Sequence, residues 1–220
     1  MVRTFTHSIR EFGWLNTIKH YVIELINKLT FFRIYRLMLI DQPKPEWLTL
    51  NPKYTCRFFN ADEMRAYLTQ EAIDLSEDFV NTAFAKGDLC CAILDDNSLI
   101  SYGWYSNQAT LINPHLRLSC ATGYTYMYHG YTHPNYRGQR LHAIRVTHGL
   151  KAHSQKGANE TNSTKGLIFY VEADNYRSLR SAARLNARNV GRVVTIRIFG
   201  KYLLHHCAGC QRYGLNITPV

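Results

Sequence analysis

The stretch Thr132-His133-Pro134-Asn135-Tyr136-Arg137-Gly138-Gln139-Arg140-Leu141-His142 lies between two segments of different character. The preceding residues, Thr122 to Tyr131, are rich in Tyr and Thr, which is typical of a β-strand. The segment Gln139 to Ser154 contains no Pro and only one Gly, which favours a helix. The predicted order is strand, tight basic loop and helix. Such a loop directs the unpaired N–H groups of the first helical turn, and the positive end of the helix dipole, at an anion such as a phosphate.

The loop carries a recognisable residue pattern. It resembles motif A of the GCN5-related N-acetyltransferase (GNAT) superfamily, in which a Pro-x-Tyr-Arg-Gly turn opens an Arg-x-x-Gly-x-Gly/Ala loop around the pyrophosphate of acetyl-CoA. The residues that match are Pro134, Tyr136, Arg137 and Gly138. Arg140 and His142 replace the two later glycines. The loop thus keeps the turn of the motif but not its bare backbone surface.

A second segment resembles the other signature of the same superfamily, Val-x-x-x-Asn-x-x-Ser/Ala followed by a helix that ends in Leu-Gly-Phe. The apolar run Leu167 to Glu172 is predicted to be a strand, and the helix that follows extends to Asn186. The matching positions are Val171, Asn175, Ser178 and Leu185. Asn186 and Ala187 replace Gly-Phe, and Ala182 stands where many members carry a Tyr. The two signatures in this order strengthen the resemblance, which covers about Tyr54 to Tyr202.

The resemblance implies a mixed α/β fold of the α+β class. Its centre would be a mixed, mostly antiparallel sheet with two splayed parallel strands, covered by helices. The splayed pair would be Thr122 to Tyr131 and Leu167 to Glu172, with the thioester in the gap between them. Sequence patterns also predict these elements: strands at 54–59, 88–94, 99–106, 192–199 and 202–206, and helices at 61–70 and 76–86.

Residues 1–50 are predicted to form an N-terminal amphipathic helix and arm, and residues 51–220 the GNAT-like acyltransferase domain. A capping-box pattern at Ser8 to Glu11 precedes apolar residues at helical spacing: Trp14, Ile18, Val22, Leu25 and Leu29. We expect this apolar stripe to dock on the domain core, with a membrane surface as the alternative. The Pro-rich turn at 41–45 marks the boundary.

Composition is that of a soluble globular protein, with 46% hydrophobic and 19% charged residues in a chain of 220. There is no signal-peptide pattern and no apolar run of roughly 20 residues that could span a bilayer. We therefore expect a cytoplasmic location, with peripheral attachment at the inner membrane surface as the alternative. The pair Cys207 and Cys210 lies beside two histidines but lacks a second ligand pair at zinc spacing, so no metal site is predicted.

The net charge of +10 favours an acidic partner or simply a solvated basic surface. The resemblance implies an N-acyltransferase that moves an acetyl or other acyl group from a CoA thioester to a primary amine of an amino sugar, an amino acid or a peptide. One alternative on the same fold is an N-acyl amino acid synthase that takes its acyl group from an acidic acyl carrier protein. Another is a non-catalytic basic module that binds nucleic acid. The oligomeric state is not indicated.

The resemblance also implies a set of site residues. The residues expected at the cofactor are Tyr131, Thr132, His133, Arg137, Gly138, Gln139, Arg140, Leu141, His142, Asn175 and Ser178. The backbone N–H of Tyr131 or Thr132 would hold the developing oxyanion. Candidates for the general base are Glu172 and His129, which would lie on the two sides of the gap. Strand alternation places His129 on the same face as Tyr131. Because Ala182 removes the usual acid, the thiolate proton would come from Tyr128, Tyr131 or water.

Overall fold

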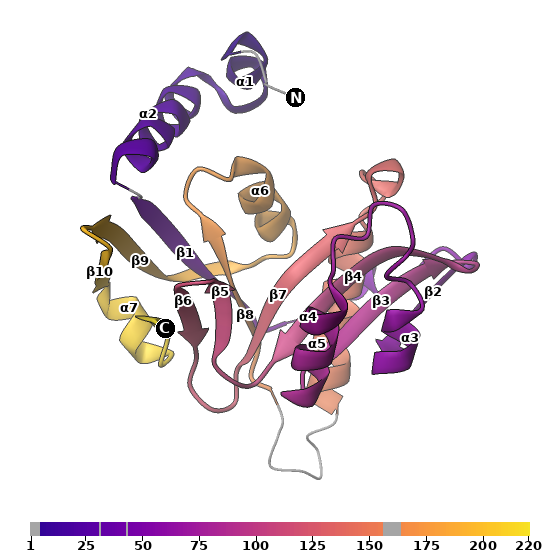
Figure 1. Cartoon of the computed structure of the whole chain (residues 1–220). Helices are drawn as coiled ribbons and strands as arrows, with labels where there is room; N and C mark the ends of the chain where they lie inside the picture. The colour runs from indigo at the N-terminus through magenta and orange to yellow at the C-terminus, as the bar shows by residue number, and fades with distance from the viewer. Residues whose placement is uncertain (1–4, 31, 43, 156–163) are drawn as a thin grey trace.

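The computed structural model describes residues 5–30, 32–42, 44–155 and 164–220 (Figure 1). Its centre is an eight-stranded sheet with the order β10-β9-β1-β8-β7-β4-β3-β2. The strands are β1 (Arg33–Ile40), β2 (Tyr54–Phe59), β3 (Leu89–Asp95), β4 (Ser98–Ser106), β7 (Thr125–Thr132), β8 (Leu167–Glu172), β9 (Arg188–Ile198) and β10 (Lys201–His206). All neighbouring pairs in this sheet are antiparallel except β7 and β8, which are parallel.

The parallel pair separates soon after it forms. Only Thr125 with Leu167 and Tyr126 with Ile168 are in register, although each strand continues for several more residues. The predicted fold class, a mostly antiparallel sheet with two splayed central parallel strands, is therefore confirmed. The strand β7 begins at Thr125, three residues later than predicted, because Gly123 turns the chain with a φ of +92°.

Helices cover both faces of the sheet. The helices α3 (Ala61–Arg65) and α4 (Glu77–Ala85) begin at side-chain caps, Asn60 and Ser76, and the Asn60–Glu63 capping box forms as predicted. They lie over the face that carries Trp104, whose ring is 5.3 Å from that of Phe79. The helices α5 (Leu141–Gln155) and α6 (Tyr176–Arg184) lie over the opposite face and share one apolar core with it.

A second, three-stranded sheet was not predicted. It has the order β11-β6-β5 and comprises β5 (Thr110–Asn113), β6 (Leu116–Ser119) and β11 (Asn216–Pro219). Leu116, Leu118 and Ile217 pack against Tyr126 and other side chains of the large sheet. The short helix α7 (Ala208–Arg212) packs in the same apolar cluster through Cys210. Strands of four residues are too short for a periodicity that could be recognised in the sequence.

The N-terminal segment differs from its prediction in two ways. It forms two helices, α1 (Phe5–Phe12) and α2 (Trp14–Thr30), because Gly13 has a φ of +81° and ends the first helix. The apolar stripe does not dock on the core: Trp14, Ile18, Val22 and Leu25 are between 46% and 61% exposed. The side chain of Leu29 lies outside the described set.

Polar contacts join these two helices to α6 and to the turn before it instead. Glu11 pairs with Arg177 at 3.2 Å, and His20 lies 3.3 Å from Asp174. The strand β1 then inserts between β8 and β9, so the division predicted at residue 50 cuts through a single sheet. A 3-10 helix, η1 (Pro45–Trp47), follows β1. Among the described residues, no helix is long and apolar enough to cross a membrane.

Candidate active site

The loop between β7 and α5 is held firmly to the antiparallel half of the sheet. After β7 the chain forms the 3-10 helix η2 (Pro134–Tyr136). The hydroxyl of Tyr136 donates to Asp95 at 2.9 Å, and the hydroxyl of Tyr54 donates to Gln139 at 2.6 Å. These bonds connect the loop to β2 and β3, so its backbone is positioned before any ligand binds.

Two residues of this loop have left-handed backbones. Gly138 has a φ of +87° and Arg140 a φ of +63°. Arg140 stands where the resembled motif has a glycine, and its guanidinium lies 5.2 Å from the centre of the Trp47 ring. The left-handed residue directly precedes Leu141, the first residue of α5. The helix therefore begins two residues later than the sequence pattern suggested, and its first N–H groups face the loop.

A basic recess of about 170 Å³ lies in front of this helix start. Three arginines line it, Arg137, Arg140 and Arg184, and no carboxylate of the described residues does. The Nε of Arg137 donates to the carbonyl of Thr132 at 3.3 Å, which leaves its terminal nitrogens without a described acceptor. A positive recess at a helix N-terminus has the electrostatics of a phosphate site.

The recess adjoins a cleft of about 930 Å³ that lies where β7 and β8 separate. Thr132, Arg137 and His142 line both spaces. On the face covered by α5 and α6 the walls include the apolar side chains of Met127, Phe169 and Val171. Alternate residues of the same strands line the opposite side, where Tyr128, Tyr170 and Glu172 lie.

A β-bulge interrupts β7 in the middle of this cleft. Tyr102 pairs with Tyr131 and Trp104 with Tyr128, so that His129 and Gly130 together oppose one residue of β4. His129 has a φ of +45°. The predicted alternation therefore fails at this point, yet His129 and Tyr131 do share a face. Their rings lie 6.2 Å and 5.0 Å from that of Tyr102.

The two candidate bases lie on the same side of the cleft. Partial burial lowers the pKa of His129, so its imidazole stays neutral although part of the ring remains exposed. Burial raises the pKa of Glu172, and the nearby Arg33, 3.8 Å away, opposes this rise. A neutral imidazole and a carboxylate with raised pKa can each accept a proton from an amine near neutral pH.

The candidate acids differ in whether the hydroxyl proton is already donated to a hydrogen-bond acceptor. The hydroxyl of Tyr131 is buried and has no hydrogen-bond partner, and burial raises its pKa, so it retains its proton. The hydroxyl of Tyr128 donates to Asp88. Ala182 is buried in the wall of the cleft and offers no proton. Tyr131 thus has an uncommitted proton, and Tyr128 does not.

The start of α6 contributes polar groups to the cleft. Asn175 is the N-cap of this helix, and its side-chain oxygen accepts from the N–H of Ser178 at 3.1 Å. Both residues line the cleft. Capping engages the side-chain oxygen of Asn175, and its side-chain amide group is not used by the cap.

Of the residues predicted from the sequence, most line one of the two spaces. The cleft or the recess is lined by His129, Tyr131, Thr132, Arg137, Gly138, Arg140, Leu141, His142, Glu172, Asn175 and Ser178. His133 and Gln139 line neither. His133 accepts from the N–H of Asn135 at 3.3 Å, and Gln139 accepts from Tyr54. Their side chains stabilise the loop itself.

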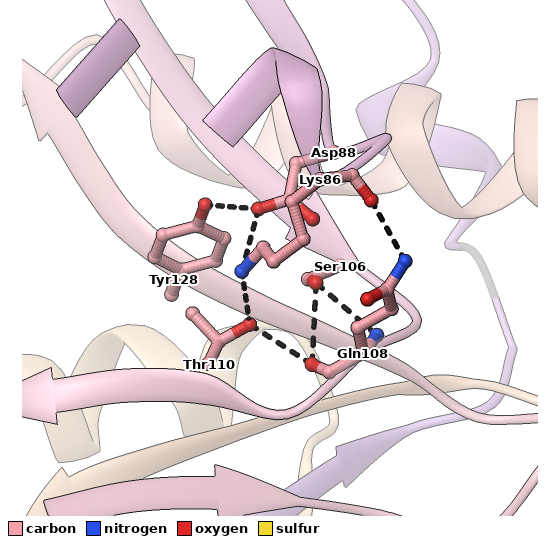
Figure 2. Close-up of polar contacts among 6 residues, drawn as sticks. All are labelled: Lys86, Asp88, Ser106, Gln108, Thr110 and Tyr128. Carbon is pink, nitrogen blue, oxygen red and sulfur yellow. Dashed lines mark hydrogen bonds and ion pairs between the residues drawn. The ribbon is translucent and has the colours of Figure 1, made fainter. Parts of the chain in front are cut away.

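A polar cluster at the far end of the cleft was not predicted (Figure 2). The ammonium of Lys86 lies 2.9 Å from Asp88 and 2.6 Å from the hydroxyl of Thr110. Tyr128 donates to the same carboxylate oxygen, and the other oxygen of Asp88 is buried without a partner. Lys86 and Asp88 come from the turn after α4, Thr110 from β5 and Tyr128 from β7, so no local sequence pattern marks the cluster.

Arg145 was also missed. It lies on α5, lines the cleft and is completely buried. The sequence signal was available: Arg145 is four residues after Leu141, on the face of the helix that turns toward the sheet. A basic residue at such a position is rare in a globular core.

The sequence matches no protein-family model and no curated protein. The structure, however, is similar to solved GNAT proteins. The tandem GNAT protein from the clavulanic acid biosynthesis pathway matches with a TM-score of 0.54 and 11% identity, over 80% of this chain and 54% of that one. A GCN5-related N-acetyltransferase-like protein from Streptococcus suis matches with a TM-score of 0.53 and 14% identity, over 83% of this chain and 67% of that one. The chain thus spans about half the length of the first protein, and it has the GNAT fold.

Proposed function

We propose that this chain, which has the GNAT fold, is an N-acyltransferase that takes an acyl group from a CoA thioester, such as acetyl-CoA, and transfers it to a primary amine. The observation that carries the proposal is the continuity between two spaces. A basic recess at the N-terminus of α5, lined by three arginines and by no carboxylate within the described part of the chain, opens into a cleft formed by two separating parallel strands. The first suits a pyrophosphate, and the second suits the extended arm that follows it.

In the proposed reaction each group of residues has a distinct role. The N–H groups of Gly138 to His142, with Arg137 and Arg140, bind the phosphates. Asn175 and Ser178 flank the pantetheine arm. The amine nitrogen attacks the thioester carbonyl carbon, the C–N bond forms, and the C–S bond breaks. Glu172 or His129 accepts the amine proton, directly or through a water.

The oxyanion and the thiolate need one donor each. The backbone N–H of Tyr131 or Thr132, next to the bulge, stabilises the oxyanion. Tyr131 is our candidate for the proton that the leaving thiolate takes up, because its hydroxyl has no other acceptor among the described residues. The acceptor is a small-molecule amine, an amino sugar or an amino acid, or a peptide amine.

Thermal denaturation with and without CoA tests the proposal. A ligand that binds only the folded protein raises the melting temperature by mass action. We expect millimolar CoA and acetyl-CoA to raise it, and inorganic pyrophosphate at the same ionic strength to do so less. A thiol-release assay over a panel of amines then identifies the acceptor. If neither CoA nor acetyl-CoA shifts the melting temperature, the proposal is wrong.

An acyl carrier protein in place of CoA is the second candidate donor. The net charge of +10 favours it, since carrier proteins are acidic, and the side chains of Arg140 and His142 narrow the recess that would hold a nucleotide. Association of oppositely charged proteins slows steeply with added salt. A strong salt dependence of turnover with a carrier-bound acyl group, together with weak CoA binding, would favour this donor.

A further inference from the structure

Arg145 carries a buried positive charge that no carboxylate among the described residues neutralises. Its side chain is 0% exposed. Nη1 donates to the hydroxyl of Tyr105 at 3.2 Å, Nη2 lies 3.1 Å from Nδ1 of His142, and the buried Nε has no hydrogen-bond partner. An ion in a protein interior without a counter-charge is strongly unfavourable. A bound anion would remove that cost.

The surrounding backbone is shaped for the guanidinium. A Cβ on Gly103 would lie 1.9 Å from Nη1, and a Cβ on Gly130 would lie 3.2 Å from Nη2. Gly103 belongs to β4, and Gly130 belongs to the bulge of β7. Two glycines on neighbouring strands therefore leave the space that the head group of Arg145 occupies, next to the point where the acyl carbonyl would lie.

The groups around the guanidinium are neutral or nearly so. Burial and the charge of Arg145 lower the pKa of His142 to about 3, so this ring accepts a hydrogen bond rather than adding charge. Burial also raises the pKa of the Cys90 thiol to about 12. The rival source of negative charge is Cys56, whose pKa is lowered by a hydrogen bond with Cys91 and by Arg145.

The position of Arg145 in the cleft indicates which part of a ligand could reach it. Arg145 and His142 lie on the α5 side of the gap, together with the apolar Met127, Phe169 and Val171. The candidate bases and the Lys86–Asp88 pair lie on the other side, where the amine would approach. A group that enters on the α5 side belongs to the donor rather than to the acceptor.

We propose that the transferred acyl group is short and ends in a carboxylate, which pairs with Arg145. The donor would be the thioester of a dicarboxylic acid, such as succinyl-CoA. The apolar side chains of the pocket suit its methylene groups. The guanidinium of Arg145 in the pocket lining, whose Nε has no partner, suits its free carboxylate, because guanidinium and carboxylate form charge-assisted hydrogen bonds. The inference rests on the proposed function, namely that this cleft binds an acyl thioester.

The decisive comparison uses wild-type protein and two donors of equal carbon number, succinyl-CoA and butyryl-CoA. Calorimetry without amine measures their affinities, and thiol release measures their kcat/KM. We expect succinyl-CoA to bind at least roughly tenfold more tightly, as a charge-assisted contact predicts. If the two donors bind equally well, this inference is wrong while the proposed function stands. If neither donor nor CoA binds, the proposed function is wrong.

Arg145→Met keeps a side chain of similar length and removes the charge. The ratio of the two affinities should fall to about one, and the melting temperature should stay the same or rise, because replacing a buried ion by an apolar group is often neutral or stabilising. Arg117→Met is the matched control, since Arg117 is exposed on β6 and outside the cleft; it should leave the ratio unchanged.

Two further outcomes are informative. A purely structural Arg145 would give a lower melting temperature in Arg145→Met and an unchanged ratio of donor affinities, which would contradict the inference. If Cys56 supplies the counter-charge, Cys56→Ala should destabilise the protein, and wild type should show no preference for succinyl-CoA. If Arg145→Met fails to fold, the wild-type ratio still decides.

Discussion

The two ends of the cleft differ in whether their positively charged side chains have a carboxylate partner. At the end next to α5, where we propose that the donor binds, Arg137, Arg140, Arg184 and the buried Arg145 have no carboxylate partner among the described residues. At the other end, where we propose that the acceptor binds, Lys86 already has one, since Asp88 lies 2.9 Å away and its side chain is only 1% exposed. The end next to α5 therefore carries an excess of positive charge, and the end with the Lys86–Asp88 pair is close to neutral.

This difference separates binding from stability. A buried ion pair contributes to folding. Removing one of its two charges leaves the other charge buried, unpaired and out of reach of water. An exposed cation without a partner contributes little to folding, and a buried one such as Arg145 opposes it. The loss of either should be felt when an anionic ligand binds. Mutations at the acceptor end should therefore lower the free energy of unfolding, whereas mutations at the donor end should lower ligand affinity.

The largest effect is expected for Asp88→Asn. Lys86 would lose its counter-ion in a partly buried site, and breaking such a pair costs about 3 kcal/mol, the low end of the range because Lys86 is 23% exposed. Denaturant unfolding measures this change. Asp62→Asn is the matched control, since Asp62 pairs with Arg65 at 91% exposure and should give no measurable change. If Asp88→Asn and Asp62→Asn lower the free energy of unfolding equally, the Lys86–Asp88 pair does not contribute more to stability than an exposed ion pair does, and the contrast between the two ends of the cleft is wrong.

Glu172→Gln should lower turnover by about a hundredfold, equivalent to about 2.7 kcal/mol, with donor affinity nearly unchanged. Burial raises the pKa of Glu172, so the group stays protonated to a higher pH than an ordinary Glu. As a base it must be ionised. The acid limb of the kcat/KM profile should therefore lie above the usual range for Glu and should disappear in the variant. If the limb persists in Glu172→Gln and disappears in His129→Gln, the base is His129.

The fold could be predicted from the sequence largely because two local motifs mark the parallel strands. The Pro134 to His142 loop and the Val171 to Ser178 segment each contain a strand end and a helix start, so they also indicate where the strands separate. The prediction failed at the N-terminal helix α2, where the apolar side chains recur at helical spacing but are not buried. Trp14, Ile18 and Val22 form an apolar stripe, but a stripe indicates only that a face could be covered, and this one remains exposed.

The candidate site could be predicted only in its local parts. The bulge at His129 and Gly130 depends on how β7 pairs with β4, which alternation along one strand does not reveal. The Lys86–Tyr128 cluster joins residues about forty positions apart, and the role of Arg145 depends on glycines in two other strands. Contacts of this kind arise from tertiary packing, so the sequence indicated the loop before α5 but not the pocket behind it.

Arg137→Ala tests the donor end directly. Removing a charge-assisted phosphate contact, which contributes about 1.5 to 3 kcal/mol, should weaken CoA binding by at least roughly tenfold. The free energy of unfolding should hardly change, because the side chain is exposed and pairs with no carboxylate that the structure describes. Calorimetry and denaturant unfolding measure the two quantities. Arg117→Ala should change neither, and a loss of stability without a loss of affinity in Arg137→Ala would contradict the assignment of this end to the phosphates.

The smallest effect, and the most specific, concerns Gly138. Its φ is +87°, and a Cβ there would meet nothing within 4 Å, so Gly138→Ala should cost only backbone strain, about 1 kcal/mol. Gly200, in the turn between β9 and β10, is closely matched, with a φ of +79° and the same empty surroundings. Gly200→Ala should therefore lower the melting temperature by a similar amount, about 2 to 4 °C for a chain of this size.

The two variants should differ in one respect only. The methyl group at Gly138 would project near the recess where a phosphate would approach the backbone, so CoA affinity should fall in Gly138→Ala and stay at the wild-type value in Gly200→Ala. Since both changes cost similar backbone strain, the difference in affinity isolates the ligand contact from the stability of the turn. If both variants lose stability equally and neither loses affinity, the loop before α5 does not bind the phosphates, and the excess charge at this end must have another partner.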